Sequence, residues 1–258
     1  MHRKVIILGL SFALIFLSFS VGAAKDPEAG RAGCGKAHLK MEPAIVGMVC
    51  KPAYIVANTP AVILISNSDS EDHDWKGNLG KKVAVDLVYR GVISFRFDMP
   101  GKGDSSKLGA GQNINDVMAK AVEQAGQWLK DHLGIPPNHV FISSYGEGVK
   151  FMGPAASLLK KNGKHFKGWI IVEAPFGVAS QSGLSSVNGF VMLARGTRSD
   201  AISEPELIKL QNMLGTKKAW VRLTTIDEMD HGLKLKNSDL SYTLTLSMSE
   251  WMSELAKR

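Results

Sequence analysis

Short apolar runs alternate with amphipathic helical segments along most of this chain, and that order restricts the fold more than any other feature. Residues 61–65 (Ala-Val-Ile-Leu-Ile) are apolar without interruption, which is typical of a strand buried on both faces. Residues 113–133 carry apolar side chains at helical spacing and end at a glycine. Repeated strand–helix alternation predicts an α/β fold, a mainly parallel, doubly wound sheet with helices on both faces.

The same pattern predicts the order of the elements. The expected strands are residues 61–65, 92–97, 140–143, 169–172, 190–194 and 219–225, and the expected helices are residues 79–90, 113–133, 148–161, 204–213 and 240–256. One or two earlier strands are expected within residues 39–57, ending in Ala53–Ala57. Because sites in such sheets lie at the carboxyl ends of the strands, we expect the loops after these strands to carry the chemistry.

The first 24 residues have the three parts of a secretory signal peptide. Basic Arg3 and Lys4 precede an apolar run, and small residues lead to a cleavage site after Ala23 or Ala24. The alternative is an uncleaved membrane anchor, but the apolar run is shorter than the roughly 20 residues that a membrane span needs. We therefore expect an exported protein, periplasmic or secreted, with residues 25–258 as one domain and no stable membrane span after cleavage.

The chain has two cysteines, Cys34 and Cys50. Export implies an oxidising compartment, in which a close pair is usually bridged, so a Cys34–Cys50 disulfide is predicted. A loop of this size contributes roughly 3 kcal/mol in the chain-entropy model. Without a Cys-x-x-Cys motif, a dedicated redox function is not expected.

The charge pattern bears on possible partners. The formal net charge is +7, but the basic residues are scattered and not interleaved with aromatic side chains. No nucleic-acid partner is therefore expected, although weak attraction to anionic surfaces is an alternative. No motif for a cofactor is found.

Four loops, in the right order over residues 60–235, resemble the α/β-hydrolase superfamily. The nearest likeness is to bacterial serine hydrolases whose first catalytic loop contains His-Gly-Ser-Gly-Pro-x-Asp-Arg-Asp. The most specific match is residues 96–105 (Arg-Phe-Asp-Met-Pro-Gly-Lys-Gly-Asp-Ser), which is similar to the family's Arg-x-Asp-x-Arg-Gly-x-Gly-x-Ser. There the resemblance implies a structural role, with Asp98 and the glycines shaping a turn. A phosphate-binding loop is the rival interpretation, but the Lys-Ser/Thr ending is missing.

The nucleophile position differs from the family pattern. Residues 144–148 (Ser-Tyr-Gly-Glu-Gly) resemble the Gly-x-Ser-x-Gly elbow, so Gly146 stands where the attacking serine belongs. Glycine tolerates the strained backbone of such a turn but has no group that could form an acyl-enzyme. Ser144 is the alternative nucleophile, although it comes two residues early.

The first loop has also changed. Residues 66–74 (Ser-Asn-Ser-Asp-Ser-Glu-Asp-His-Asp) match the family at Asp72 and Asp74, but Ser66 and Asn67 replace the His-Gly that begins it. In the family this loop donates a backbone N–H to the oxyanion hole, so Ser66 and Asn67 predict a degenerate oxyanion loop. A metal bound by the acids of this loop is a weaker alternative, because their spacing matches no EF-hand.

The base and acid positions complete the comparison. The resemblance implies that His231 is the catalytic base, since residues 230–232 (Asp-His-Gly) follow the last strand. Ser199 stands at the family's acid position and Asp200 comes one residue later, so Asp200 is the candidate acid. Residues 173–188 are too few for a helical cap, which predicts an open cleft.

These residues lead to two functional hypotheses. The first is an exported pseudo-hydrolase that lacks the nucleophile and binds a ligand or protein in the open cleft. The alternative is an active hydrolase of ester or amide bonds that uses His231 with Asp200 and either Ser144 or a water molecule. Neither hypothesis requires a cofactor or a metal.

Overall fold

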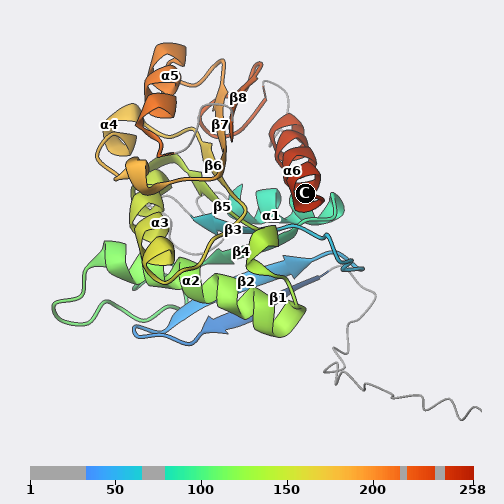
Figure 1. Ribbon diagram of the computed structural model, residues 1–258, viewed down its shortest axis with the longest axis vertical. Helices are drawn as coiled ribbons and strands as arrows, with labels where there is room; N and C mark the ends of the chain where they lie inside the picture. Colours follow the sequence, from blue (N-terminus) through green and yellow to red (C-terminus); the bar gives the residue numbers. More distant parts are fainter. Residues whose placement is uncertain (1–32, 66–78, 216–219, 236–241) are drawn as a thin grey trace, which may run out of the picture.

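The computed structural model describes residues 33–65, 79–215, 220–235 and 242–258. Within these ranges, eight strands form one sheet in the order β1-β2-β4-β3-β5-β6-β7-β8 (Figure 1). The strands β3 to β8 run parallel to one another, while β2 is antiparallel to both β1 and β4. The mainly parallel sheet that the strand–helix alternation predicts is therefore confirmed.

The elements have the following bounds. The strands are β1 (Gly33–Leu39), β2 (Ile45–Lys51), β3 (Ala61–Ile65), β4 (Ile93–Phe97), β5 (Val140–Tyr145), β6 (Gly168–Val172), β7 (Phe190–Gly196) and β8 (Val221–Ile226). The helices are α1 (Leu79–Tyr89), α2 (Ile114–Leu133), α3 (Met152–Lys161), α4 (Phe176–Ala179), α5 (Glu204–Met213) and α6 (Tyr242–Ala256). Short 3-10 helices are η2 (Pro137–His139), η3 (Gly146–Phe151) and η4 (Leu184–Ser186).

Helices cover both faces of the sheet and divide the core into two layers (Figure 1). Side chains of α2, α3 and α5 pack on one face, against residues such as Ile63 of β3 and Ile142 of β5. Side chains of α1 and α6 pack on the other face, against Leu64 and Phe141. The central strand β3 is buried along its whole length, as its uninterrupted apolar sequence predicts.

The prediction that a strand ends in Ala53–Ala57 is wrong. These residues lie between β2 and β3 in no strand, and Tyr54 and Val56 are 78% and 66% exposed. The backbone turns here, since Thr59 donates its N–H to the carbonyl of Val56. Prolines at positions 52 and 60 bound the segment, and proline cannot donate a ladder hydrogen bond, so the apolar run does not extend the sheet.

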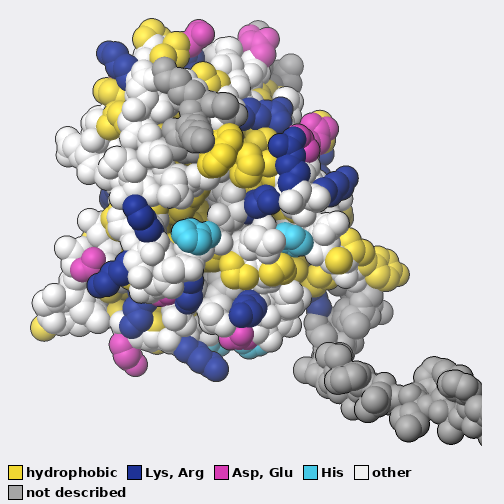
Figure 2. All heavy atoms as spheres, in the orientation of Figure 1, with side chains coloured by type: hydrophobic (Ala, Val, Ile, Leu, Met, Phe, Trp, Pro, Cys, Tyr) yellow, Lys and Arg dark blue, Asp and Glu magenta, His cyan; other side chains and the backbone are white. Residues whose placement is uncertain are grey.

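Figure 2 shows Lys and Arg side chains spread over one face of the molecule, with hydrophobic side chains gathered where β7 and β8 lie. Trp220, directly before β8, and Leu223, within β8, are 43% and 42% exposed. Among the helices of the described residues, none has both the length and the apolar character that a membrane crossing requires.

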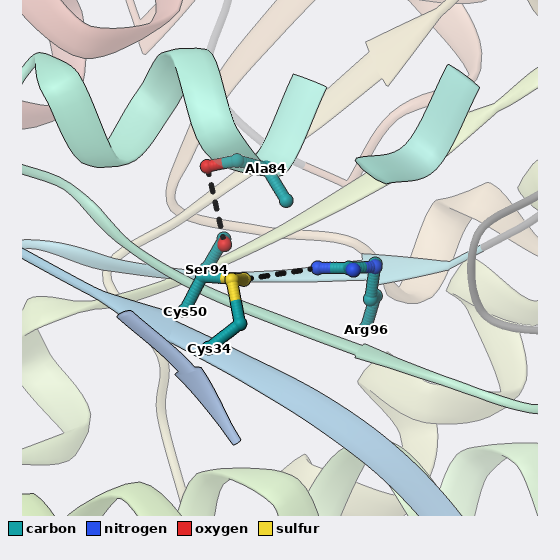
Figure 3. Close-up of a disulfide and its surroundings, with 5 residues drawn as sticks. All are labelled: Cys34, Cys50, Ala84, Ser94 and Arg96. Atoms are coloured by element: carbon teal, nitrogen blue, oxygen red, sulfur yellow. Dashed lines mark hydrogen bonds between the residues drawn. A yellow bond between two sulfur atoms is a disulfide. The ribbon is translucent and has the colours of Figure 1, made fainter. Parts of the chain in front are cut away.

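The predicted disulfide is present and joins Cys34 to Cys50 (Figure 3). The two residues lie directly opposite each other in the antiparallel pairing of β1 with β2. The bridge therefore ties the first strand of the sheet to its neighbour.

The turn after β4 is built around the buried carboxylate of Asp98. One oxygen of this carboxylate accepts a hydrogen bond from the backbone N–H of Asp104, and a Cβ at Gly103 would lie 2.5 Å from the carboxyl carbon. Glycine is required at position 103 by this close approach and by its φ of +49°. Asp98 therefore shapes the turn, which is the structural role that the family resemblance implies.

Candidate active site

The candidate site lies where the carboxyl ends of β5, β6, β7 and β8 meet. These strands are parallel and adjacent, so the residues that follow them come to one edge of the sheet. Gly146 follows β5, Glu173 follows β6, Ser199 follows β7 and His231 follows β8.

Gly146 occupies a sharp turn from strand to helix. Tyr145 ends β5 in an extended conformation, η3 begins at Gly146, and α3 continues from it. Gly146 is buried and has a φ of +56°, in the left-handed region where a side chain is disfavoured. Glycine adopts this positive φ without strain, and the centre of the turn therefore carries no side chain.

Ser144 does not lie beside His231 in the sheet. It pairs with Ile65 of β3 and Ile171 of β6, and both belong to the core layer under α2 and α3. Because side chains alternate along a strand, Ser144 faces that layer while Tyr145 faces the other. The Ser144 hydroxyl is fully buried and has no hydrogen-bond partner in the part of the chain that the structure describes.

His231 lies in the loop after β8, against Tyr145. The two rings stack with centroids 5.5 Å apart and planes inclined by 28°. The Tyr145 hydroxyl donates a hydrogen bond to the carbonyl oxygen of His231. Burial, together with the negative charges of Glu173 and Asp230, raises the pKa of Tyr145 to about 12, so the phenol stays protonated and remains a donor.

Glu173 is a fully buried carboxylate directly after β6. Its two oxygens accept hydrogen bonds from the backbone N–H of Gly196 and from the hydroxyl of Ser199. Its own N–H donates to the carbonyl of Ala194, and its φ is +52°, which is uncommon for a residue with a side chain. Neighbouring loops therefore hold the Glu173 carboxylate in one orientation.

This carboxylate is the acidic partner of His231. Oε2 of Glu173 lies 3.6 Å from Nδ1 of His231, which is an ion-pair distance slightly longer than a hydrogen bond. The Glu173 carboxylate raises the pKa of the His231 imidazole above its usual value; the charges of Asp200 and Asp230 act in the same direction, and partial burial opposes them. Nδ1 of His231 is buried and makes no hydrogen bond within the described residues, so Glu173 is its nearest charged partner there.

Asp200, the acid that the sequence suggests, is exposed and influences His231 only through its charge. Ser199, which stands at the family's acid position, instead donates its hydroxyl to Glu173. Position 199 thus supports a carboxylate that comes from the neighbouring strand.

Close backbone packing brings the loops after β7 and β8 together. A Cβ at Gly196 would lie 2.0 Å from the carbonyl oxygen of Met229, so only glycine fits there. Thr197 and Arg198 donate their N–H groups to the carbonyls of Ile226 and Met229. These contacts determine where the chain that carries His231 leaves the sheet.

Glu173 does not appear among the candidates from the sequence. A usable signal was present, because an acid follows the buried run of residues 168–172 at the carboxyl end of a central strand. From the sequence, residues 173–188 predict only that a helical cap is missing. In the structure they contain the short helices α4 and η4 and pack tightly on α3, since a Cβ at Gly153 would lie 1.9 Å from the carbonyl oxygen of Ser182.

The predicted oxyanion loop, with Ser66 and Asn67, lies outside the described residues, as do the acids of residues 69–74. In the ranges that the structure describes, no group of three or more His, Cys, Asp or Glu side chains is placed to hold a metal ion.

No protein-family model matches this chain, and no curated protein sequence matches it. Solved structures do match this chain. A cold-adapted esterase from an Arctic intertidal metagenomic library matches with a TM-score of 0.62 and 15% identity, over 86% of this chain and 93% of its own. Dienelactone hydrolase from Anabaena variabilis matches with a TM-score of 0.61 and 15% identity, over 87% of this chain and 98% of its own.

The chain has the α/β-hydrolase fold. An α/β serine hydrolase homologue from Coxiella burnetii is a further neighbour, with a TM-score of 0.59 and 13% identity over 85% of this chain and 96% of that one. Identities this low show a shared fold and carry no activity from one protein to another. Function must therefore be argued from the site.

Proposed function

We propose that this protein is an exported pseudo-hydrolase, which binds a ligand or a protein at the site beside Gly146 and His231 and does not form an acyl-enzyme. Gly146 carries the proposal. It occupies the positive-φ turn after β5, where a nucleophilic side chain would have to stand. Ser144 does not replace that side chain, because it is buried on the face of β5 opposite to Tyr145 and its partner His231.

Export rests on the signal sequence of residues 1–24, and the Cys34–Cys50 disulfide is compatible with it. The binding role rests on the site itself. A half-exposed imidazole that stacks on Tyr145 beside a buried carboxylate offers a ligand a polar group.

The test is ester turnover by the mature chain, residues 25–258, with p-nitrophenyl acetate and butyrate as substrates. We expect hydrolysis no faster than that of the His231→Ala variant, and no labelling by a fluorophosphonate probe. His132→Ala is the matched control, because His132 is exposed on α2 and stacks on Trp128, and any surface histidine hydrolyses activated esters slowly. Turnover that His231→Ala abolishes and His132→Ala preserves would refute the proposal.

A second candidate function is hydrolysis by a water molecule that His231 activates. The pairing of His231 with a buried carboxylate favours it, because this pair is the part of a hydrolase site that deprotonates a nucleophile. The two functions differ in their response to Glu173→Gln. Water-based hydrolysis predicts activity that is insensitive to the fluorophosphonate probe and is lost in both His231→Ala and Glu173→Gln.

A further inference from the structure

The two cysteines of the disulfide differ in their exposure to solvent. Cys34 is exposed on β1, the last strand at one edge of the sheet, whereas Cys50 on β2 is completely buried. The side chains of the two cysteines stand on the same face of the sheet, because Cys34 and Cys50 lie directly opposite each other in the β1–β2 pairing. A small molecule from solvent therefore reaches Cys34 and is kept from Cys50.

A buried cation contacts the inner sulfur. Nη1 of Arg96 donates a hydrogen bond to Sγ of Cys50 at 3.2 Å, and Arg96 is only 2% exposed (Figure 3). The guanidinium group of an arginine carries a positive charge. A positive charge beside a sulfur stabilises its thiolate, and a sulfur that is more stable as a thiolate is the better leaving group in exchange.

We propose that the Cys34–Cys50 bond is a thiol–disulfide exchange site for small-molecule thiols, in which Cys34 is attacked and Cys50 leaves. An external thiolate forms a bond to Sγ of Cys34 while the bond between the two cysteine sulfurs breaks. The electron pair of that bond goes to Sγ of Cys50, where Arg96 stabilises the negative charge. Attack by the Cys50 thiolate on the mixed disulfide reverses the step and releases the external thiol.

The charge near Cys34 indicates which thiols fit best. Lys36 lies two residues farther along β1, so its side chain stands on the same face as that of Cys34, and its ammonium group pairs with Asp104 at 2.7 Å. Positively charged side chains around a reactive sulfur favour a thiol that carries carboxylates. Reduced glutathione is therefore the probe for the experiment, and cysteamine, a cationic thiol, is its comparison.

The first experiment locates the attacked sulfur in the wild-type protein. The oxidised mature chain is exposed briefly to reduced glutathione, quenched with acid, alkylated after unfolding and analysed as peptides by mass spectrometry. We expect glutathione on Cys34 and the alkyl group on Cys50 in nearly all exchanged molecules. The same reaction in concentrated urea should label both cysteines, because unfolding removes the difference in burial. Equal labelling in the folded protein, or exchange no faster than global unfolding, would overturn the proposal.

The second experiment tests the role of Arg96. Arg96→Met removes the charge and keeps much of the side-chain volume, whereas Arg96→Lys keeps the charge. We expect exchange with glutathione to slow by on the order of tenfold in Arg96→Met and to stay near the wild-type rate in Arg96→Lys. Near-ultraviolet circular dichroism checks the fold, and the three proteins should exchange at one rate in urea. A folded Arg96→Met protein that exchanges at the wild-type rate contradicts the role of Arg96. If this variant does not fold, the first experiment tests the proposal by showing which cysteine of the wild-type protein carries glutathione.

Discussion

The carboxylate of Glu173 lies 3.6 Å from Nδ1 of His231, although 57 residues separate the two in the chain. Glu173 directly follows the strand β6 and is completely buried, while the His231 side chain is 41% exposed. A histidine and a buried carboxylate are thus paired next to Tyr145, the residue before the turn at Gly146. This arrangement leads to the following predictions.

Replacing Glu173 with Gln should lower the pKa of His231 towards its ordinary value. The carboxylate stabilises the imidazolium, so its loss favours the neutral ring. A titration of the His231 ring protons by NMR measures the change. Asp200→Asn is the matched control and should cause a smaller decrease, because Asp200 acts only through its charge. A larger effect from Asp200→Asn would make Asp200 the main partner.

The same pair makes stability depend on pH. The pKa of His231 is raised in the folded state, so the folded protein binds this proton more tightly than the unfolded chain does. The resulting stabilisation is fully present below the unfolded-state pKa of histidine and is lost as the pH rises through the folded-state value. Urea unfolding at a series of pH values should show the wild-type advantage over Glu173→Gln shrinking across that interval. An advantage that grows as the pH rises would contradict this pairing.

Gly146→Ser should destabilise the protein without creating an efficient esterase. A side chain at a φ of +56° costs on the order of 1–3 kcal/mol. Gly146→Ala carries the same backbone cost and no hydroxyl, so the two variants should unfold at similar urea concentrations. Any difference in their ester turnover then comes from the hydroxyl group. High activity in Gly146→Ser alone would show that the other residues of the site can still support ester hydrolysis, and it would contradict the pseudo-hydrolase proposal.

Gly196→Ala should disturb the His231 loop. Its new methyl group would lie 2.0 Å from the carbonyl oxygen of Met229, and backbone there cannot yield without moving the loops after β7 and β8. We expect a loss of about 1–3 kcal/mol in the free energy of unfolding, as for other overpacked sites, and an altered NMR signal of His231. Gly35→Ala is the control, since a Cβ at Gly35 meets nothing within 4 Å. Equal stabilities of the two variants would show that this contact is loose.

Removing the disulfide should destabilise the fold without changing the site. The bridge closes a loop with a sequence separation of 16 residues, which corresponds to roughly 3 kcal/mol in the chain-entropy model. The Cys34→Ser, Cys50→Ser double variant should therefore melt at a lower temperature in calorimetry, while the NMR titration of His231 stays as in the wild type. A changed His231 titration would indicate that β1 and β2 are coupled to the site.

The sequence by itself determined the order of the elements, because burial on both faces, helical spacing and turn residues are local properties that read directly from neighbouring positions. It also determined that Gly146 lies at the turn after β5, that Asp98 shapes the turn after β4, and that Cys34 pairs with Cys50. The prediction of a strand at the apolar residues 53–57 was wrong. A strand needs hydrogen-bonding partners as well as hydrophobic side chains, and this run lies between two prolines, which cannot donate a backbone hydrogen bond.

Only the tertiary structure decided which acid serves His231. Glu173, Ser199 and Asp200 all follow central strands, and from the sequence each could reach the same edge of the sheet. The choice depends on the stagger of β6, β7 and β8 and on the close approach of Gly196 to Met229, which places His231 over the end of β6. Such contacts join residues far apart in the chain, and their geometry is a property of the packed sheet as a whole.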